Sequence, residues 1–246
     1  MELSWILVAL LSFGGGFIGS MMSGGSVVIL SLLKFLDVPT KIAIGTLKLT
    51  IAGLTLVSML TYFKGGAVDV RIAPALTFSS LVGAVLGSAF FLSLPEKEAN
   101  LLVAIFLTVG VYFTLKSKPK FKRNSQKLSR KAVPIIGFLI GFYIGILGVA
   151  STLIVIAALG LFFRLDMLKA NGTAKMIIFV NNSIAALTYA SKGSIDYHTA
   201  LLILAPLLLG SWLGAKTALK MGDKKLKVVF AAIALLTALK LITELF

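Results

Sequence analysis

GGGFIGSMMSGGS, from Gly14 to Ser26, interrupts an apolar run that extends from Leu3 to Leu36. The run is longer than the roughly 20 helical residues that cross a bilayer. Glycine weakens a helix and serine favours caps and turns, so the stretch predicts two short helices that meet at a turn at membrane depth. The alternative is one long tilted helix whose glycines allow close packing of neighbouring helices.

A weaker stretch of the same kind, GFYIGILGVAS, lies at residues 141–151 and belongs to an internal duplication. An ungapped offset of 127 residues pairs GTLK at 45–48 with GTAK at 172–175, and also pairs Asp69 with Asp196. Glycine-interrupted segments at matching positions of two halves are typical of the binding site of a transporter.

The composition predicts an all-α polytopic membrane protein, because 58% of the 246 residues are hydrophobic and 13% are charged. We expect a first transmembrane repeat at 1–115, a basic cytoplasmic linker at 116–131 and a second repeat at 132–246. With no cysteine and a single histidine, His198, which we place in a loop, we expect no metal and no cofactor. The predicted membrane segments are the two broken runs and 42–62, 72–94, 100–115, 170–190, 199–219 and 228–245.

The net charge of +15 raises the possibility of a nucleic-acid partner, but the positions of the charges argue against it. Many basic residues fall in the central linker, where the enrichment of lysine and arginine in cytoplasmic loops explains them. We therefore expect the lipid bilayer as a partner, and no nucleic acid. The basic residues of the linker are Lys116, Lys118, Lys120, Lys122, Arg123, Lys127, Arg130 and Lys131.

Loop charges also bear on the topology. If each broken segment crosses once, the halves are parallel repeats with four crossings each, eight spans in all, and twelve basic residues lie inside against ten outside. If each broken segment enters and returns as a short hairpin, seventeen lie inside and five outside. The second arrangement agrees better with the positive-inside rule. It predicts two inverted-topology repeats of five segments each in the cytoplasmic membrane, and the parallel arrangement remains the alternative.

Lys48 and Lys175, which the duplication relates, are the only charged residues that we do not assign to loops or to the ends of segments. Each lies about 9 Å into its helix, so a lysine that extends to the membrane surface is one interpretation. An intramembrane charge is otherwise a functional-site hypothesis. No carboxylate is predicted at that depth, so the counter-charge is expected to be a small anionic substrate.

Polar groups near these lysines complete the predicted site. The helix ends at the glycine turns supply backbone N–H donors with a favourable dipole. The threonines of the two motifs supply hydroxyls, and Thr55 and Asn182 follow one lysine each by seven residues on the same helical face. Buried Thr and Asn side chains also often bond only their own helix. Besides the lysines, the predicted substrate-binding residues are Thr46, Thr173, Ser23, Gly24, Gly25, Ser26, Ser151, Thr152, Thr55 and Asn182. Asp69 and Asp196 are interpreted as turn or cap residues.

With its glycine-rich break, the AxxTxK-like start of the next helix at 43–48, the second copy at 170–175 and the charged linker, the chain resembles the sulfite exporter TauE/SafE family, also called the sulfonate uptake permease family. The resemblance covers nearly the whole chain. It implies secondary transport of small organosulfur anions such as sulfite, sulfoacetate or sulfonates. Many members of the family carry an aspartate where this chain has Gly19 and Ile144, which places carboxylate-based cation coupling in doubt.

Four classes of function remain to be weighed. A carrier that works by alternating access is preferred, and an anion channel is the alternative within transport. An intramembrane enzyme would require ionisable groups or metal ligands in the membrane, and none is predicted there, so we expect no enzymatic activity. A scaffolding subunit would move nothing when purified. A homo-oligomer is compatible with all four.

Overall fold

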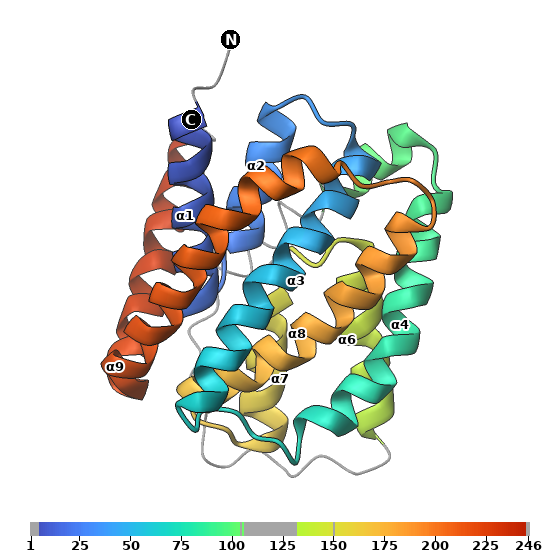
Figure 1. The fold of residues 1–246 in the computed structure, drawn as a ribbon. Helices are drawn as coiled ribbons and strands as arrows, with labels where there is room; N and C mark the ends of the chain where they lie inside the picture. The colour runs from blue at the N-terminus through green and yellow to red at the C-terminus, as the bar shows by residue number, and fades with distance from the viewer. Residues whose placement is uncertain (1–4, 104, 106–131, 150, 245–246) are drawn as a thin grey trace.

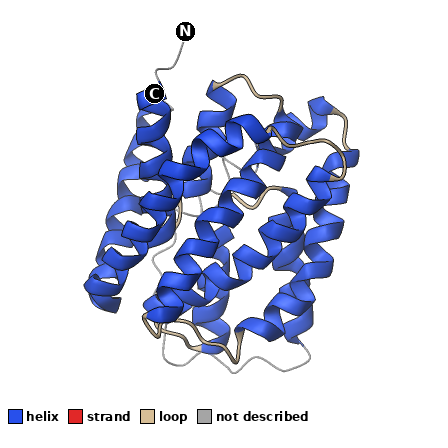
Figure 2. Cartoon of the chain, in the orientation of Figure 1, coloured by secondary structure: helices blue, strands red, loops and turns tan. Residues whose placement is uncertain are grey.

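The computed structural model describes residues 5–103, 105, 132–149 and 151–244 of the chain. Helices make up most of these residues and no strand occurs among them (Figures 1 and 2). The predicted all-α fold is therefore confirmed. The basic linker at 116–131 and most of the segment predicted at 100–115 lie outside the described residues.

The first apolar run forms two short helices, α1 (Trp5–Met21) and α2 (Gly25–Phe35). Between them Gly24 has a φ of 113°, a conformation that side chains other than glycine rarely adopt. The helices return on each other, since a Cβ on Gly19 would lie 2.8 Å from the Cα of Gly25. The interpretation as one long helix is wrong, and the predicted pair of short helices is confirmed.

The second broken run likewise forms α6 (Val133–Ile146) and α7 (Ser151–Phe163), with Gly148 at a φ of 67° between them. In both runs the first helix continues well into the predicted glycine stretch, to Met21 in the first run and to Ile146 in the second. Gly141 lies inside α6 and contacts another helix, where a Cβ would be 1.8 Å from the carbonyl oxygen of Ser80. Several glycines thus serve the close packing that the alternative interpretation assigned to them.

Two long helices, α3 (Thr40–Lys64) and α8 (Met167–Ala190), cross at the centre of the bundle. A Cβ on Gly45, near the start of α3, would lie 1.8 Å from the oxygen of Ser194, just after α8. Gly172, near the start of α8, is held in the same way against Ala67, just after α3. The start of each helix therefore meets the end of the other, and Figure 1 shows them running in opposite directions.

The remaining helices of each half pack on helices of the other half. Helix α4 (Ala73–Ser93) packs on α6, and α9 (Tyr197–Glu244) packs on α1 (Figure 1). Glycines again allow contact of backbone with backbone: a Cβ on Gly16 would lie 2.1 Å from the oxygen of Leu207. Gly222, at a φ of 68°, kinks α9 between the two segments that the sequence predicts as separate.

Among the described residues, three helices are long and apolar enough to cross a membrane: α3, α4 and the part of α9 at Tyr197–Gly222. The four helices of the two broken runs are apolar and shorter. Helix α8 has 24 residues, but it carries three asparagines and two lysines that lower its apolar character. Polar residues of α3 and α8, Thr55 and Lys175 among them, lie beside the two breaks and are buried in an otherwise apolar bundle.

Candidate functional site

Lys175 extends from α8 to the C-terminal end of α1 and is fully buried. Its Nζ donates to the carbonyl oxygen of Gly19 at 2.6 Å and to that of Met22 at 3.0 Å. The last carbonyls of a helix have no partner within the helix and carry a partial negative charge, so a lysine is stabilised there. An ammonium group has three N–H donors, and these two carbonyls occupy two of them.

Two neighbouring side chains complete the cap of α1. Asn171, one turn before Lys175, donates from Nδ2 to the oxygen of Met21 at 2.7 Å and to the hydroxyl of Tyr62 at 2.8 Å. The Tyr62 hydroxyl in turn donates to the oxygen of Ser20 at 3.0 Å. The end of α1 can therefore lie inside the protein at membrane depth without unsatisfied carbonyls.

Lys48, the partner of Lys175 in the duplication, is also fully buried and donates to the carbonyl oxygen of Ile144 near the end of α6. Ile144 corresponds to Gly19 when the two broken stretches are aligned on their Gly-Phe pairs. Each lysine thus caps the broken segment of the other half. Within the described part of the chain, both ammonium groups have backbone carbonyls as their hydrogen-bond partners and neither has a carboxylate.

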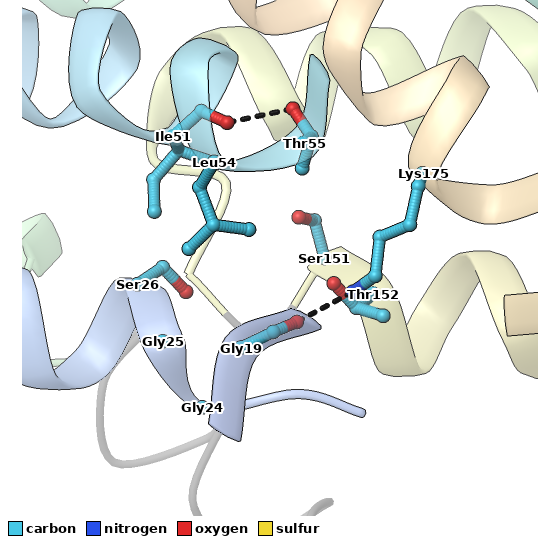
Figure 3. A pocket seen from close by; sticks show the side chains of 10 residues that line it. All are labelled: Gly19, Gly24, Gly25, Ser26, Ile51, Leu54, Thr55, Ser151, Thr152 and Lys175. Atoms are coloured by element: carbon cyan, nitrogen blue, oxygen red, sulfur yellow. Dashed lines mark hydrogen bonds between the residues drawn. The ribbon is translucent and has the colours of Figure 1, made fainter. Parts of the chain in front are cut away.

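A small pocket lies where the two breaks meet (Figure 3). The N-terminal ends of α2 and α7 both reach it, and Lys175 approaches from α8. Its volume, taken as the space open to the centre of a water molecule, is about 10 Å³, enough for roughly one water. The lining residues are Gly19, Gly24, Gly25, Ser26, Ile51, Leu54, Thr55, Ser151, Thr152 and Lys175.

Seven of the predicted site residues line this pocket and five do not. Among those outside, Asn182 donates to Ile178 in its own helix, and Ser23 lies within the first break. Thr55 lines the pocket, but its hydroxyl donates to the oxygen of Ile51 in its own helix at 2.6 Å (Figure 3). The predicted residues that line the pocket are Gly24, Gly25, Ser26, Thr55, Ser151, Thr152 and Lys175, and those outside are Lys48, Thr46, Thr173, Ser23 and Asn182.

The two motif threonines hold loops of the opposite half. The hydroxyl oxygen of Thr46 accepts the backbone N–H of Asp196 at 2.9 Å, and that of Thr173 accepts the N–H of Asp69 at 2.9 Å. Both threonines are buried. In the structure these hydroxyls therefore join the start of one central helix to the loop that follows the other.

Replacing Thr46 with valine is expected to destabilise the protein by about 1 kcal/mol, because the N–H of Asp196 loses its acceptor in a partly buried hydrogen bond. Thermal unfolding of the purified protein, followed by size-exclusion chromatography, measures the change. Thr46→Ser keeps the hydroxyl and serves as the control. Equal unfolding temperatures for the valine and serine variants would contradict the assignment.

The prediction that Asp69 and Asp196 are turn or cap residues is confirmed. Asp69 Oδ1 accepts the backbone N–H of Arg71 at 2.9 Å. Asp196 precedes α9, and its carboxylate accepts the N–H of Thr199 at 3.0 Å and its hydroxyl at 2.6 Å. The hydroxyl bond of Thr199 lowers the pKa of the Asp196 carboxyl, as is usual for a carboxylate at a helix N-terminus.

Sequence reasoning missed several residues of this region. Asn171 gave a usable signal, because it precedes Lys175 by four residues and so shares its helical face. Gly19, Ile51 and Leu54 gave none, since apolar residues and backbone atoms line a pocket through tertiary packing alone.

The described fold and site define a class of protein: a polytopic membrane protein in which two broken apolar helices meet at a buried cationic pocket. Such sites are typical of transporters. A family model described as Sulfite exporter TauE/SafE matches residues 8–241. The chain belongs to the TauE/SafE sulfite exporter family, and it is a membrane transporter rather than an enzyme.

Full-length relatives agree with this assignment. The chain is 24% identical over 249 residues to a probable membrane transporter protein of Haemophilus influenzae, covering 99% of this chain and 98% of the relative. It is 24% identical to the probable membrane transporter protein YjnA of Bacillus subtilis, with 98% and 100% of the two chains covered. The corresponding figures for YfcA of Escherichia coli are 24% identity and coverage of 93% and 86%. No solved structure matches the chain significantly.

Proposed function

We propose that this protein is a secondary transporter that binds a small oxyanion, of the sulfite, sulfonate or sulfoacetate class, in the pocket where the two breaks meet. The observation that carries the proposal is Lys175, a fully buried lysine without a carboxylate partner among the described residues, which lines a pocket at the start of two helices. The organosulfur substrate class comes from the family to which the chain belongs.

The chemistry of the pocket favours a negatively charged ligand. Backbone N–H groups in the first turn of a helix have no acceptor one turn earlier, and the helix dipole is positive there. Helices α2 and α7 both begin at the pocket, so their dipoles add to the charge of Lys175. The hydroxyls of Ser151 and Thr152 supply further donors. Among the described residues the third N–H of Lys175 has no acceptor, so in this proposal it binds the anion.

Inverted repeats give this site a route to both sides of the membrane. Helices α3 and α8 occupy equivalent positions in the duplicated sequence and run in opposite directions, which supports a two-fold axis in the membrane plane. The mutual caps of Lys48 and Lys175 obey the same relation. In this proposal each half has five segments, the chain lies in the cytoplasmic membrane, and exchange of conformation between the halves opens the site alternately.

The size of the pocket implies that binding requires movement. A cavity for roughly one water is too small for a sulfur atom with three oxygens. The N-terminal ends of α2 and α7 must therefore separate to admit the anion. Because α2 and α7 belong to different halves, such a separation is a motion of one half relative to the other.

Small oxyanions are expected to raise the thermal stability of the purified protein, because a ligand that binds only the folded state stabilises it. At one hundred times the dissociation constant the stabilisation is about 2.7 kcal/mol. Sulfite, methanesulfonate and sulfoacetate should be compared with chloride at equal ionic strength. If no oxyanion exceeds chloride at any concentration, the binding proposal fails.

Exchange in proteoliposomes separates a carrier from a channel. A carrier exchanges labelled sulfite for preloaded anion with a rate that saturates. A rate that rises in proportion to concentration, together with electrical conductance, would instead identify an anion channel.

A further inference from the structure

A second pocket lies between α3 and α9, apart from the two breaks. Its volume, taken as the space open to the centre of a water molecule, is about 550 Å³. One part of its wall is apolar and the other is basic. The residues of interest are Val57, Leu60, Thr61, Lys64, Trp212 and Lys216.

The two lysines lie at the same end of neighbouring helices. A Cβ on Gly53 would contact Leu204 and Leu208, and one on Gly65 would contact Leu219. Later residues of α3 therefore contact later residues of α9, so these two helices run parallel. Lys64 and Lys216 consequently lie at one level, on the side of the bundle where α3 ends.

Charge and exposure distinguish this pocket from the buried site. Both lysines are exposed, and neither has a carboxylate partner in the part of the chain that the structure describes. Lys216 Nζ lies 3.8 Å from the ring centroid of Trp212, an interaction that fixes the ammonium group over the aromatic face. Leu60 and Trp212 are 47% and 43% exposed, so the apolar wall opens outward from the bundle.

The duplicated sequence provides an internal comparison. At the equivalent positions of the other half, Thr61 and Leu60 are matched by Thr188 and Leu187. The basic and aromatic residues are not matched: Lys64, Lys216 and Trp212 correspond to Ser191, Ala89 and Val85. Lys64, Lys216 and Trp212 are thus specific to the α3–α9 pair and are not repeated at the equivalent positions of the other half.

We infer that this pocket binds an anionic phospholipid, with the headgroup phosphate between Lys64 and Lys216 and an acyl chain along Val57 and Leu60. Basic pockets between transmembrane helices bind lipid phosphates, and tryptophan favours the boundary between headgroups and acyl chains. A free phosphate would gain nothing from the apolar wall. The site is separate from the proposed anion pocket, so each proposal can fail without the other.

Trp212 gives a direct test, because the chain has two tryptophans and Trp5→Phe leaves Trp212 as the sole tryptophan, which is excited selectively at wavelengths where tyrosine does not absorb. The full-length variant is reconstituted in zwitterionic bilayers that contain a minor fraction of brominated phosphatidylglycerol or brominated phosphatidylcholine. We expect brominated phosphatidylglycerol to quench Trp212 at concentrations on the order of tenfold lower than phosphatidylcholine. In the Lys64→Gln/Lys216→Gln background the preference is lost.

Arg71→Gln/Lys169→Gln is the matched control, since it removes the same charge from exposed residues near the same end of the bundle. It should leave the preference unchanged. Inorganic phosphate should not displace the brominated lipid, and displacement would indicate a free-anion site. Equal quenching by the two lipids, or an equal loss in both double variants, would show only a general attraction of basic residues to the membrane surface. Displacement by phosphate, equal quenching by the two lipids, or an equal loss in both double variants would each overturn the inference.

Discussion

Lys175→Met is expected to reduce anion uptake into proteoliposomes at least tenfold. The substitution keeps the length of the side chain but removes the charge that faces the pocket, and a hydrogen bond to a charged group contributes about 1.5–3 kcal/mol. It should also abolish the thermal stabilisation by oxyanions. Lys192→Met, which removes a lysine from the exposed α8–α9 loop, is the control for the loss of one positive charge.

A structural role of Lys175 must be separated from a role in binding. Asn171→Leu removes hydrogen bonds to the same end of α1 but leaves the charge. We expect this variant to unfold at a lower temperature and still to be stabilised by oxyanions. If Lys175→Met folds and retains normal uptake and normal stabilisation, Lys175 is a helix cap and the site assignment is wrong.

Lys48→Met has a different expected result in the same assays. Lys48 does not line the pocket in this conformation, so oxyanions should still stabilise the variant. Transport should fall, because the proposed alternating-access mechanism would place Lys48 at the site in the opposite conformation. Loss of both properties would mean that the two lysines act on one conformation.

Gly16→Ala is expected to destabilise the fold by about 3 kcal/mol or more, and Gly14→Ala is expected to be neutral or stabilising. A Cβ at Gly16 would lie 2.1 Å from the carbonyl oxygen of Leu207 and 3.0 Å from the backbone nitrogen of Ser211. Backbone atoms cannot rotate away, so α1 and α9 must separate. A Cβ at Gly14 meets nothing within 4 Å, and alanine favours a helix by up to about 1 kcal/mol.

Thermal unfolding of both variants, followed by size-exclusion chromatography, measures this difference. The apparent Tm of Gly16→Ala should fall by about 10 °C relative to Gly14→Ala. Since the two positions differ by two residues in one helix and receive the same substitution, equal unfolding temperatures would contradict the close packing of α1 on α9.

The sequence predicted the main features of the fold because composition and periodic breaks are local signals. The helix breaks, the burial of Lys48 and Lys175 and the caps at Asp69 and Asp196 all follow from residue type and position. The positions of the turns were less accurate, since most glycines before each turn contact a helix that is distant in the chain. Composition alone could not distinguish a glycine that breaks a helix from one that admits a neighbour.

The partners of the two lysines could not be predicted from the sequence. Every residue has a backbone carbonyl, so the sequence does not indicate which carbonyl oxygens accept hydrogen bonds from the lysines. The predicted partner of the two ammonium groups is therefore an external anion. In the structure they first satisfy helix ends of the opposite half. This arrangement also explains why the threonines of the two motifs lie outside the pocket: they hold the loops that follow the central helices.

Because helices of one half pack on helices of the other half, some contacts of the first half can form only after the second half has been translated. Helix α1 leaves the ribosome well before α9, on which it packs, is translated. The carbonyls at the end of α1 also lack their hydrogen-bond donors until Asn171 and Lys175 have been translated. The insertion machinery or nearby lipid must therefore accommodate an immature N-terminal hairpin through most of translation, and the early hairpin reaches its final environment only when the late helices arrive.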